Sequence, residues 1–313
     1  MIDGVRKKIL QKQGYKVVGN HSAIKICLWC KKAVRGEDFC YKHTFYGIRS
    51  WRCIQASVSV DVCNQKCVWC WRDIDTNGLK YDVVDEPSEI LDGFVREQRK
   101  ALEGYHGYGG VDVEKLKETT EPKHVALSLT GETCMYPKLP EMIEEIRRRG
   151  MTSFVVTNGT VPSMVKKLVQ VKPTQFYITL PAPNEKTYTE VCNPLIEDGW
   201  GRIMKSLEML DRFERGTVRL TLVKGLNMID ADDYVRVLKN VDFKFLELKA
   251  AMPVGYARYR MDYKQMPTHA EIRKFSEKVA KKGGFKIIDE KENSRVVLLM
   301  REDFDGRIMK FMD

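Results

Sequence analysis

From residue 53 onward, apolar runs alternate with amphipathic stretches, and this alternation constrains the fold more than any other feature of the sequence. We predict strands at 53–62, 124–130, 152–157, 174–180, 217–223 and 243–249. Helices are predicted near 88–105, 138–149, 161–170, 199–214 and 230–240. Strand–helix alternation favours parallel strands with helical crossovers. We therefore predict an α/β fold, a partial (β/α)6 barrel rather than a closed eight-stranded one.

The two ends of the chain follow different patterns. Residues 1–52 show a short helix near 5–10 and then no clear periodicity, so we expect an extension with little core, held together by a metal centre. The tail has a helix near 269–282 and two apolar runs, at 285–289 and 294–300, which predict a hairpin. The predicted parts are a basic extension (1–52), the barrel (53–284) and a short C-terminal α+β extension (285–313).

Positive charge is concentrated at the N-terminus. The chain has 313 residues and a net charge of +10, and residues 1–53 hold 12 Lys and Arg against three Asp and Glu. Such a segment indicates either a polyanionic partner or a solvated basic tail. A membrane-spanning helix would need about 18 consecutive apolar residues, and the sequence has no such run. It also begins without a secretory signal, so we expect a cytoplasmic protein with no membrane partner.

Seven of the nine cysteines are clustered within residues 27–70. In a chain without a secretory signal, clustered cysteines are expected to bind metal rather than form disulfides. Cys63, Cys67 and Cys70 form a C-x3-C-x2-C motif directly after the first predicted strand. Three thiolates on one loop suit a [4Fe–4S] cluster whose fourth iron stays open to a small molecule. Zinc is the alternative, but a structural zinc site needs a fourth ligand, such as Cys53.

This motif after a first barrel strand resembles the radical S-adenosylmethionine (SAM) superfamily. Gly131 and Glu132 end the second predicted strand, where the resemblance implies contacts to the SAM amino group. Asn158 ends the third strand, where it is expected either to bind a ribose hydroxyl or only to form a turn. Arg219 and Thr221 are weaker candidates for SAM or substrate contacts, since an arginine on a strand also suits a salt bridge.

A second group of cysteines precedes the barrel, at Cys27, Cys30, Cys40 and Cys53. The Cys27-x2-Cys30 pair alone is typical of a zinc knuckle. The surrounding sequence resembles the archaeal 4-demethylwyosine synthases over most of the chain. The matching stretches are 26–29, 39–42, 45–48, 52–55, 63–72, 124–129, 131–132, 154–159, 245–249 and 254–256.

The resemblance implies that Cys27, Cys40 and Cys53 bind a second [4Fe–4S] cluster. Cys30 is an additional thiol, and as a fourth ligand it would close that cluster to substrate. We favour the three-cysteine set, which leaves an open iron for pyruvate. Cys134 and Cys192 are interpreted as ordinary buried thiols.

The implied activity is a carbon–carbon lyase reaction on RNA. N1-methylguanosine-37 of tRNA(Phe) would condense with pyruvate to give the tricyclic base 4-demethylwyosine, with release of formate. A methyl C–H bond is not acidic, so its activation requires the radical that SAM supplies. The sequence contains no flavodoxin-like domain, so a separate one-electron donor is expected as a partner.

Two lysines are candidates for holding pyruvate. Lys42 matches the lysine that the family is proposed to use for a Schiff base, although it could equally pair with a tRNA phosphate. Lys249 is the second candidate because it lies at a predicted strand end, on the same face as Glu247. That pair also suits a plain ion pair.

The anticodon loop of tRNA is the expected macromolecular partner. The basic candidates for phosphate contacts are Lys7, Lys8, Lys12, Lys25, Lys31, Lys32 and Arg35. The aromatic candidates for stacking on the extruded base, most of which equally suit packing in the core, are Trp29, Tyr41, Phe45, Tyr46 and Trp51. Two alternatives stay open at this point: a radical SAM enzyme with another substrate, and a non-catalytic zinc-binding RNA protein.

Overall fold

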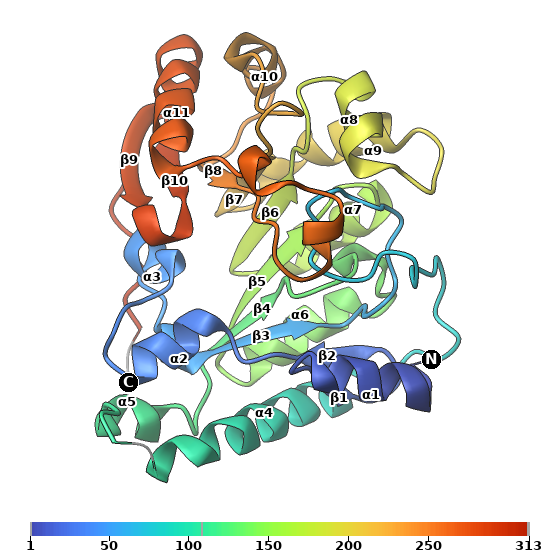
Figure 1. Cartoon of the computed structure of the whole chain (residues 1–313), viewed down its shortest axis with the longest axis vertical. Helices are drawn as coiled ribbons and strands as arrows, with labels where there is room; N and C mark the ends of the chain where they lie inside the picture. The colour runs from blue at the N-terminus through green and yellow to red at the C-terminus, as the bar shows by residue number, and fades with distance from the viewer. Residues whose placement is uncertain (1, 108, 312–313) are drawn as a thin grey trace. The chain divides into compact units, whose positions relative to one another are not determined.

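The computed structural model describes residues 2–107 and 109–311, which divide into two compact units (Figure 1). The first unit comprises Met1–Val62, Leu79–Val156 and Met309–Asp313. The second comprises Cys63–Gly78 and Thr157–Ile308. Each unit is a sheet with helices packed on it.

The first unit has the strand order β1-β2-β3-β4-β5. The strands are β1 (Lys16–Val18), β2 (Ser22–Ile24), β3 (Cys53–Ser57), β4 (His124–Leu127) and β5 (Thr152–Thr157). β1, β2 and β3 pair antiparallel, whereas β3, β4 and β5 pair in parallel. The helices are α1 (Gly4–Lys12), α2 (Leu28–Val34), α3 (Tyr41–Tyr46), α4 (Pro87–Glu103), α5 (Val113–Glu118) and α6 (Leu139–Arg148), with 3-10 turns at Ser50–Arg52, Gly104–Gly107 and Thr133–Met135.

The second unit has the strand order β6-β7-β8-β10-β9. The strands are β6 (Gln175–Thr179), β7 (Gly216–Leu222), β8 (Phe245–Ala250), β9 (Lys286–Lys291) and β10 (Val296–Met300). β6, β7 and β8 are parallel, and the β9–β10 hairpin adds to β8 in the antiparallel sense. The helices are α7 (Pro162–Val171), α8 (Glu185–Cys192), α9 (Gly199–Leu207), α10 (Ala231–Leu238) and α11 (His269–Gly283), with 3-10 turns at Leu210–Arg212, Gly255–Tyr259, Tyr263–Gln265 and Glu292–Ser294.

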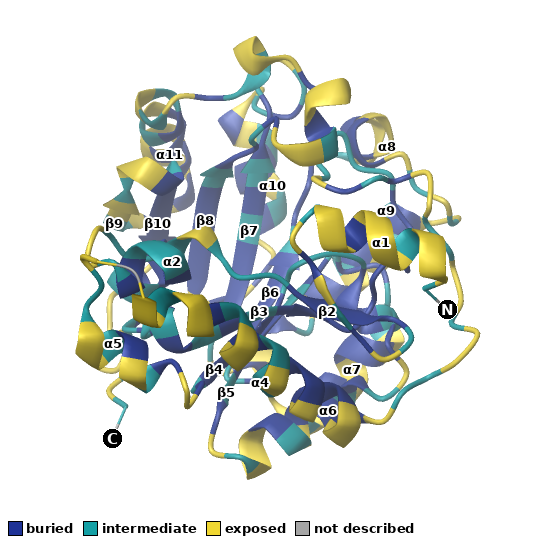
Figure 2. Cartoon of the chain, turned by 60° about the horizontal axis from the view of Figure 1, so that its bottom comes forward, coloured by how far each residue is buried: buried dark blue, intermediate teal, exposed yellow. Residues whose placement is uncertain are grey.

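All six predicted barrel strands are present as β3 to β8, and the predicted tail hairpin is β9–β10. The barrel strands owe their recognisable apolar pattern to buried residues, and β7 and β8 are dark blue along most of their length in Figure 2. In the hairpin, β10 is buried throughout, whereas β9 is only half-buried or exposed. The first strand is shorter than predicted, ending at Ser57 rather than at residue 62.

The N-terminal segment is better packed than the sequence indicated. The expectation of little core there is wrong, because Leu10, Tyr15 and Ala23 form a buried cluster with Val60. Phe45 and Tyr46 on α3 are also fully buried. The segment contains three helices, and the short helix predicted near residues 5–10 is only the first of them. Apolar side chains therefore stabilise this segment before any metal is considered.

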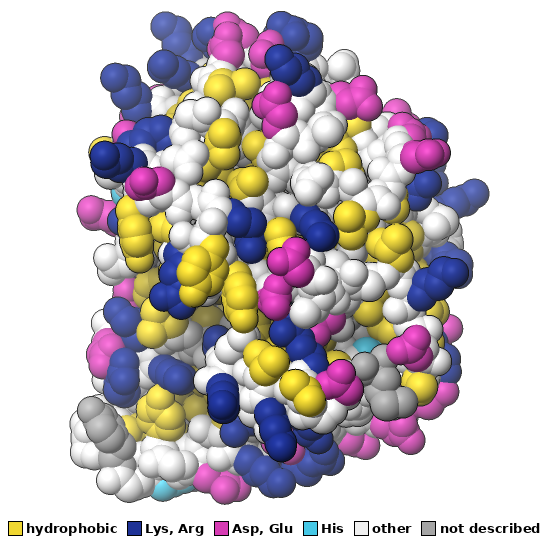
Figure 3. All heavy atoms as spheres, turned by 45° about the vertical axis from the view of Figure 1, so that its right-hand side comes forward, with side chains coloured by type: hydrophobic (Ala, Val, Ile, Leu, Met, Phe, Trp, Pro, Cys, Tyr) yellow, Lys and Arg dark blue, Asp and Glu magenta, His cyan; other side chains and the backbone are white. Residues whose placement is uncertain are grey.

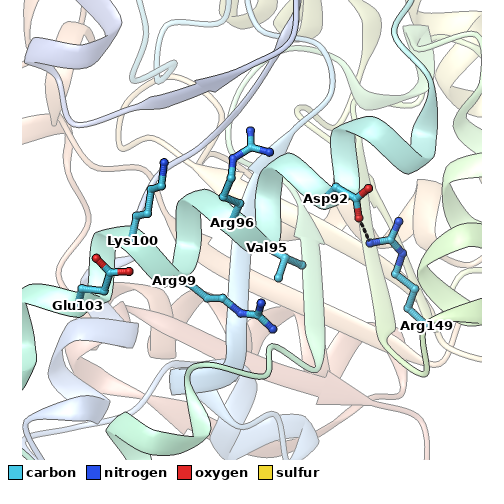
Figure 4. Close-up of a pocket in the computed structure, with 7 residues that line it drawn as sticks. All are labelled: Asp92, Val95, Arg96, Arg99, Lys100, Glu103 and Arg149. Atoms are coloured by element: carbon cyan, nitrogen blue, oxygen red, sulfur yellow. Dashed lines mark hydrogen bonds and ion pairs between the residues drawn. The ribbon is translucent and has the colours of Figure 1, made fainter.

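The helix α4 has one apolar and one charged face. Its apolar residues, including Leu91 and Phe94, are buried against the sheet and α6. Its other side borders an open groove of about 470 Å³ (Figure 4). The groove is lined by Asp92, Val95, Arg96, Arg99, Lys100, Glu103 and Arg149. Arg149 pairs with Asp92 at 2.5 Å, and no predicted site residue lines this groove.

None of the helices in the described part of the chain is long and apolar enough to cross a membrane.

Candidate functional site

The loop cysteine group, Cys63, Cys67 and Cys70, lies on a segment of the second unit that is fixed by backbone hydrogen bonds. The amides on either side of Cys67 donate to the C-terminal end of α8: Lys66 N to Cys192 O at 2.8 Å, and Val68 N to Val191 O at 2.9 Å. The Cys70 amide donates to Cys67 O at 3.0 Å. The loop conformation is therefore set by protein contacts as well as by any ligand.

Asn158 is tied to the same loop. Its Nδ2 donates to Asn64 Oδ1 at 2.9 Å, and its Oδ1 accepts from the Thr160 amide at 3.0 Å. Asn64 is nearly fully buried, and its Nδ2 donates to Thr160 Oγ1 at 2.8 Å. Asn158 thus forms the turn expected after its strand, and it also lies beside the residue that follows Cys63.

Among the three loop cysteines, Cys67 has a raised pKa and a close polar contact. Its Sγ lies 3.3 Å from Gln65 Oε1, and a hydrogen bond with the Cys192 thiol together with burial raises the pKa of Cys67 well above its usual range. Cys192 is fully buried as predicted, but it is not isolated, because it contacts a loop cysteine. Within residues 2–107 and 109–311, no three Cys, His, Asp or Glu side chains are gathered in a metal-binding arrangement. The donor set of three soft thiols on one loop nevertheless suits an iron–sulfur cluster.

Gly131 occupies a position in the first unit that only glycine can fill. Its φ is +75°, and an added Cβ would lie 1.7 Å from the Ser59 carbonyl oxygen. The adjacent Ser59 Oγ and Thr130 Oγ1 are buried and have no hydrogen-bond partner among the described residues. Unsatisfied polar atoms beside a close backbone approach suit a polar ligand such as the SAM amino group.

Glu132 makes contacts within the protein that fix its side chain and backbone. Its side chain is buried, and its Oε1 accepts from the Cys134 amide at 2.9 Å, while its amide donates to Val62 O at 2.8 Å. The carboxylate therefore fixes the turn that follows β4.

In the second unit, four predicted residues share one face of two neighbouring strands. The parallel register places Arg219 beside Glu247 and Thr221 beside Lys249. Arg219 Nη2 pairs with Glu247 Oε2 at 2.8 Å, which is the salt bridge given as the alternative for an arginine on this strand. Lys249 Nζ donates to Ser294 O at 2.6 Å.

Asn227, which follows β7, holds the turn at the end of that strand. Its side chain is fully buried, donates to the carbonyls of Pro181 and Thr221, and accepts from the Val223 amide.

The N-terminal cysteine group, Cys27, Cys30, Cys40 and Cys53, comes from three elements of the first unit. Cys27 and Cys40 are the N-cap residues of α2 and α3, with extended backbones, and neither side chain caps its helix. Cys30 lies on α2 and is 1% exposed, whereas Cys53 begins β3.

Electrostatic interaction with other thiols of this group raises the pKa of Cys30 and of Cys53, although the described residues do not gather these thiols into a metal-binding arrangement. Burial and the neighbouring thiols of Cys40 and Cys27 raise the pKa of Cys53 to about 12. The pKa of Cys30 is raised further, first by burial and then by Cys27 and Cys53. Four thiols from α2, α3 and β3 still supply the soft donors that a metal cluster needs, while burial opposes ionisation of Cys30 and Cys53.

Lys42 lies on α3 beside this group and is 8% exposed. Its Nζ is 5.0 Å from the centre of the Phe154 ring, and its charge lowers the pKa of Cys53 against the effect of burial. The neighbouring His124 is held neutral, with its pKa lowered to about 3 by burial and by Arg52, Arg49, Lys123 and Lys42. This part of the first unit is therefore both buried and electropositive.

The α3 helix also receives contacts from the last described residues. The Met309 amide donates to Tyr46 O at 3.0 Å, and the Phe311 ring lies 4.7 Å from His124.

For three of the aromatic candidates the structure favours the alternative, packing in the core, over base stacking. Tyr41, Phe45 and Tyr46 are buried in the core, so they cannot stack on a base without unfolding. Trp51 is half-buried and donates its Nε1 to Glu118.

The predicted basic contacts fall into two classes. Lys7, Lys8 and Lys12 are exposed on α1. The others, Lys25, Lys31, Lys32 and Arg35, are half-buried. On the face shown in Figure 3, Lys and Arg side chains are intermixed with Asp and Glu.

Comparison with known proteins identifies the family. The model of the radical SAM superfamily matches residues 57–238, and the model described as "Wyosine base formation" matches residues 242–301. The chain is 44% identical to the S-adenosyl-L-methionine-dependent tRNA 4-demethylwyosine synthase of Pyrococcus abyssi, over 95% of this chain and 89% of that one. The enzyme of the same name from Pyrococcus horikoshii is 42% identical over the same shares. The chain belongs to the tRNA 4-demethylwyosine synthase family.

A solved structure agrees with the sequence comparison. TYW1 with a lysine–pyruvate adduct bound is 35% identical and superposes with a TM-score of 0.90, covering 99% of this chain and all of that one. The predicted fold class, a partial (β/α)6 radical-SAM-type barrel, is confirmed, and so is the resemblance to 4-demethylwyosine synthases. Membership of the radical SAM superfamily implies SAM and an iron–sulfur cluster.

Sequence reasoning missed one set of contacts around the site. Segment 188–195 fixes the cysteine loop through Cys192, Val191 and the Leu195 amide, which donates to Asn64 O at 2.9 Å. The one residue of this segment that the sequence singled out was Cys192, and Cys192 is not part of any recognisable motif.

Proposed function

We propose that this protein is a radical SAM enzyme that condenses N1-methylguanosine-37 of tRNA(Phe) with pyruvate to form 4-demethylwyosine, a reaction of the carbon–carbon lyase class. The observation that carries the proposal is the buried, electropositive surrounding of Lys42 beside the N-terminal cysteine group. The names of the relatives and the lysine–pyruvate adduct in TYW1 support it.

Each cysteine group is assigned one [4Fe–4S] cluster. Cys63, Cys67 and Cys70 would hold the cluster that binds SAM, and the bound, reduced cluster supplies the electron that cleaves SAM to a 5′-deoxyadenosyl radical. Cys27, Cys40 and Cys53 would hold the second cluster, with Cys30 behind them as a packing residue rather than a ligand.

The assigned SAM contacts follow the two motifs at strand ends. The backbone at Gly131 would receive the SAM ammonium, which the unsatisfied Ser59 and Thr130 hydroxyls support. Glu132 would contribute negative charge from behind that turn, and Asn158 would bind a ribose hydroxyl. Arg219 and Thr221 are assigned to the same ligand or to substrate.

Lys42 is assigned to pyruvate. Its amine, once neutral, would add to the C2 carbonyl and release water to give an imine. Pyruvate is an anion, and the positive charges of Arg49, Arg52 and Lys123 near His124 favour its carboxylate. His124 itself stays neutral at physiological pH, so it would act as a hydrogen-bonding group.

Lys249 is the second candidate for the imine. Its Nζ is already hydrogen-bonded to Ser294 O at 2.6 Å, and its strand neighbour is Thr221. Lys42 is buried whereas Lys249 is only half-buried, so we assign Lys42 first.

The remaining assignments concern partners and organisation. The anticodon loop is the proposed RNA segment, with a separate protein as the one-electron donor and the cytoplasm as the site of action. The division into an extension (1–52), a barrel (53–284) and a C-terminal extension (285–313) likewise stays a prediction.

The test is to trap the imine. The anaerobically reconstituted full chain is treated with labelled pyruvate and borohydride, digested, and analysed by mass spectrometry. Label on Lys42, abolished in Lys42→Arg and retained in Lys249→Arg, is expected. Label on Lys249 alone would reassign the residue, whereas an active enzyme that takes up no label would remove the imine step.

A further inference from the structure

Exposed aromatic side chains are concentrated on two neighbouring segments of the second unit. Four aromatic residues are exposed in the described part of the chain: Trp71 (48%), Tyr259 (73%), Tyr263 (68%) and Phe304 (39%). Trp71 directly follows the last loop cysteine, and the two tyrosines lie on the segment between β8 and α11. Single exposed rings are common, but three of four on two adjoining segments call for an explanation.

The two segments are bound to each other by hydrogen bonds. The Tyr256 amide donates to Trp71 O at 2.8 Å, and Arg260 Nη2 donates to the carbonyls of Cys70 and Arg72. Gly255 has a φ of +56°, and an added Cβ would lie 2.4 Å from Trp71 O, so the chains approach closely. Residues 254–264 therefore adjoin the end of the cysteine loop.

Segment 254–264 is a rigid element rather than a loose loop. Met261 packs in a buried cluster with Val223 and Ala251, against Val68 and Trp69. Asp262 and Gln265 form a capping box, and Gln265 O accepts from the Lys224 amide at 2.8 Å. Tyr259 and Tyr263 are thus displayed on a fixed backbone, which lowers the entropic cost of binding through them.

The charge of this element favours a nucleic acid over an apolar partner. Residues 254–264 contain Arg258, Arg260 and Lys264 against one acidic residue, Asp262. Arg258 lies 5.5 Å from the centre of the Tyr259 ring. Interleaved tyrosine, arginine and lysine side chains are typical of surfaces that stack on unpaired bases and bind the flanking phosphates.

We propose that Trp71, Tyr259 and Tyr263 form a stacking surface for unpaired bases of the RNA substrate, with Arg258 and Lys264 on the adjoining phosphates. This inference rests on the proposed function, because it specifies how that substrate is held. The proposed surface takes the stacking role for which Tyr41, Phe45 and Tyr46 were candidates, since those three side chains are buried. Since the surface adjoins Cys70 through backbone contacts, a base stacked there is held beside the cysteine loop.

The test measures binding of the reconstituted full chain to a tRNA(Phe) transcript, to its anticodon hairpin, and to the same stem as a plain duplex. Tyr259→Ala and Tyr263→Ala should each weaken binding of the tRNA and the hairpin roughly tenfold and leave duplex binding unchanged. Tyr259→Phe and Tyr263→Phe keep the ring and should bind as the parent does. Arg258→Ala with Lys264→Ala should lower the slope of log affinity against log salt by about one unit for each phosphate that is no longer bound.

Phe304→Ala, at the fourth exposed ring, is the matched control and should change nothing. Trp71→Ala is interpreted only alongside its iron content and visible spectrum, since Trp71 follows Cys70. Hairpin affinity unchanged in both tyrosine-to-alanine variants would overturn the proposal. The same holds if these variants lose only cluster reduction by a flavodoxin-class protein, because the surface would then bind the electron donor. A parent chain that binds no tRNA would overturn the proposed function itself.

Discussion

The two cysteine groups are built in opposite ways. The loop cysteine group lies within one short stretch whose backbone is fixed by Val191 and Cys192 at the end of α8. The N-terminal cysteine group comes from α2, α3 and β3, so the placement of its thiols depends on how those elements pack. The loop group therefore depends on local structure, whereas the N-terminal group depends on tertiary structure, and a cluster bound there would act as a cross-link.

The strongest test of this contrast removes one group at a time. We expect Cys63→Ala, Cys67→Ala and Cys70→Ala together to reduce SAM cleavage to background. The corresponding changes at Cys27, Cys40 and Cys53 should leave 5′-deoxyadenosine formation but abolish the tricyclic base. Iron should fall from about eight to about four per chain in each case, measured with sulfide and zinc after anaerobic reconstitution. About four irons and one zinc in the parent protein would make the N-terminal site structural.

A finer comparison lies within the N-terminal group, between Cys27 and Cys30. Cys27→Ala should lose about four irons, because a ligand of the second cluster is missing. Cys30→Ala should keep its iron and lose only a little stability, since Cys30 is a buried thiol on α2. Iron analysis and thermal unfolding of the two variants separate these outcomes. Equal iron loss in both would make Cys30 a fourth ligand and close the cluster.

Gly131 tests the close approach near the predicted SAM site. Gly131→Ala should destabilise the protein by roughly 2–4 kcal/mol, because the new Cβ meets Ser59 O in a left-handed backbone conformation. Gly150→Ala is the matched control, with a φ of +67° and nothing within 4 Å of the added Cβ, and should cost about 1 kcal/mol. Urea unfolding measures both. Equal losses would show that only the backbone angle matters at Gly131.

The smallest expected effect is on the pH dependence of stability in the first unit, which carries the N-terminal cysteine group. His21 Nδ1 bonds Val58 O at 2.7 Å, and its Nε2 accepts from the Asp85 amide at 3.0 Å, an arrangement that needs a neutral ring. Burial lowers the pKa of His21 below the ordinary 6.5. The unfolded chain then binds more protons below pH 6.5, so stability should fall as pH drops through that value. His21→Phe should flatten this part of the stability–pH curve. An unchanged slope would assign the pH dependence to another group.

The sequence predicted those parts of the molecule whose cause is local. Strands β3 to β8 are apolar because both faces are covered, and the C-x3-C-x2-C loop is readable because its three ligands adjoin in sequence. The prediction of little core in the N-terminal segment was wrong because that core is assembled from residues far apart in the sequence. Leu10 packs with Val60, and such a contact produces no hydrophobic periodicity.

In the candidate site, too, residues in local sequence motifs could be predicted, whereas contacts made by the tertiary fold could not. Gly131 was identified from a motif, and the structure adds the reason, which is the approach of Ser59. Arg219 was a candidate either for a ligand contact or for a salt bridge, and the parallel register supplies its partner, Glu247 on the next strand. The exposure of Tyr259 and Tyr263 and the burial of Tyr41 could not be predicted, because a tyrosine suits either environment until its neighbours are known.

The contact between Met309 and Tyr46 joins two segments that are far apart in the sequence. The carbonyl at the end of the helix that carries Lys42 accepts from an amide that comes after β10, the last strand of the second unit. The surroundings of Lys42 are therefore complete only when this distant segment has folded back onto the first unit.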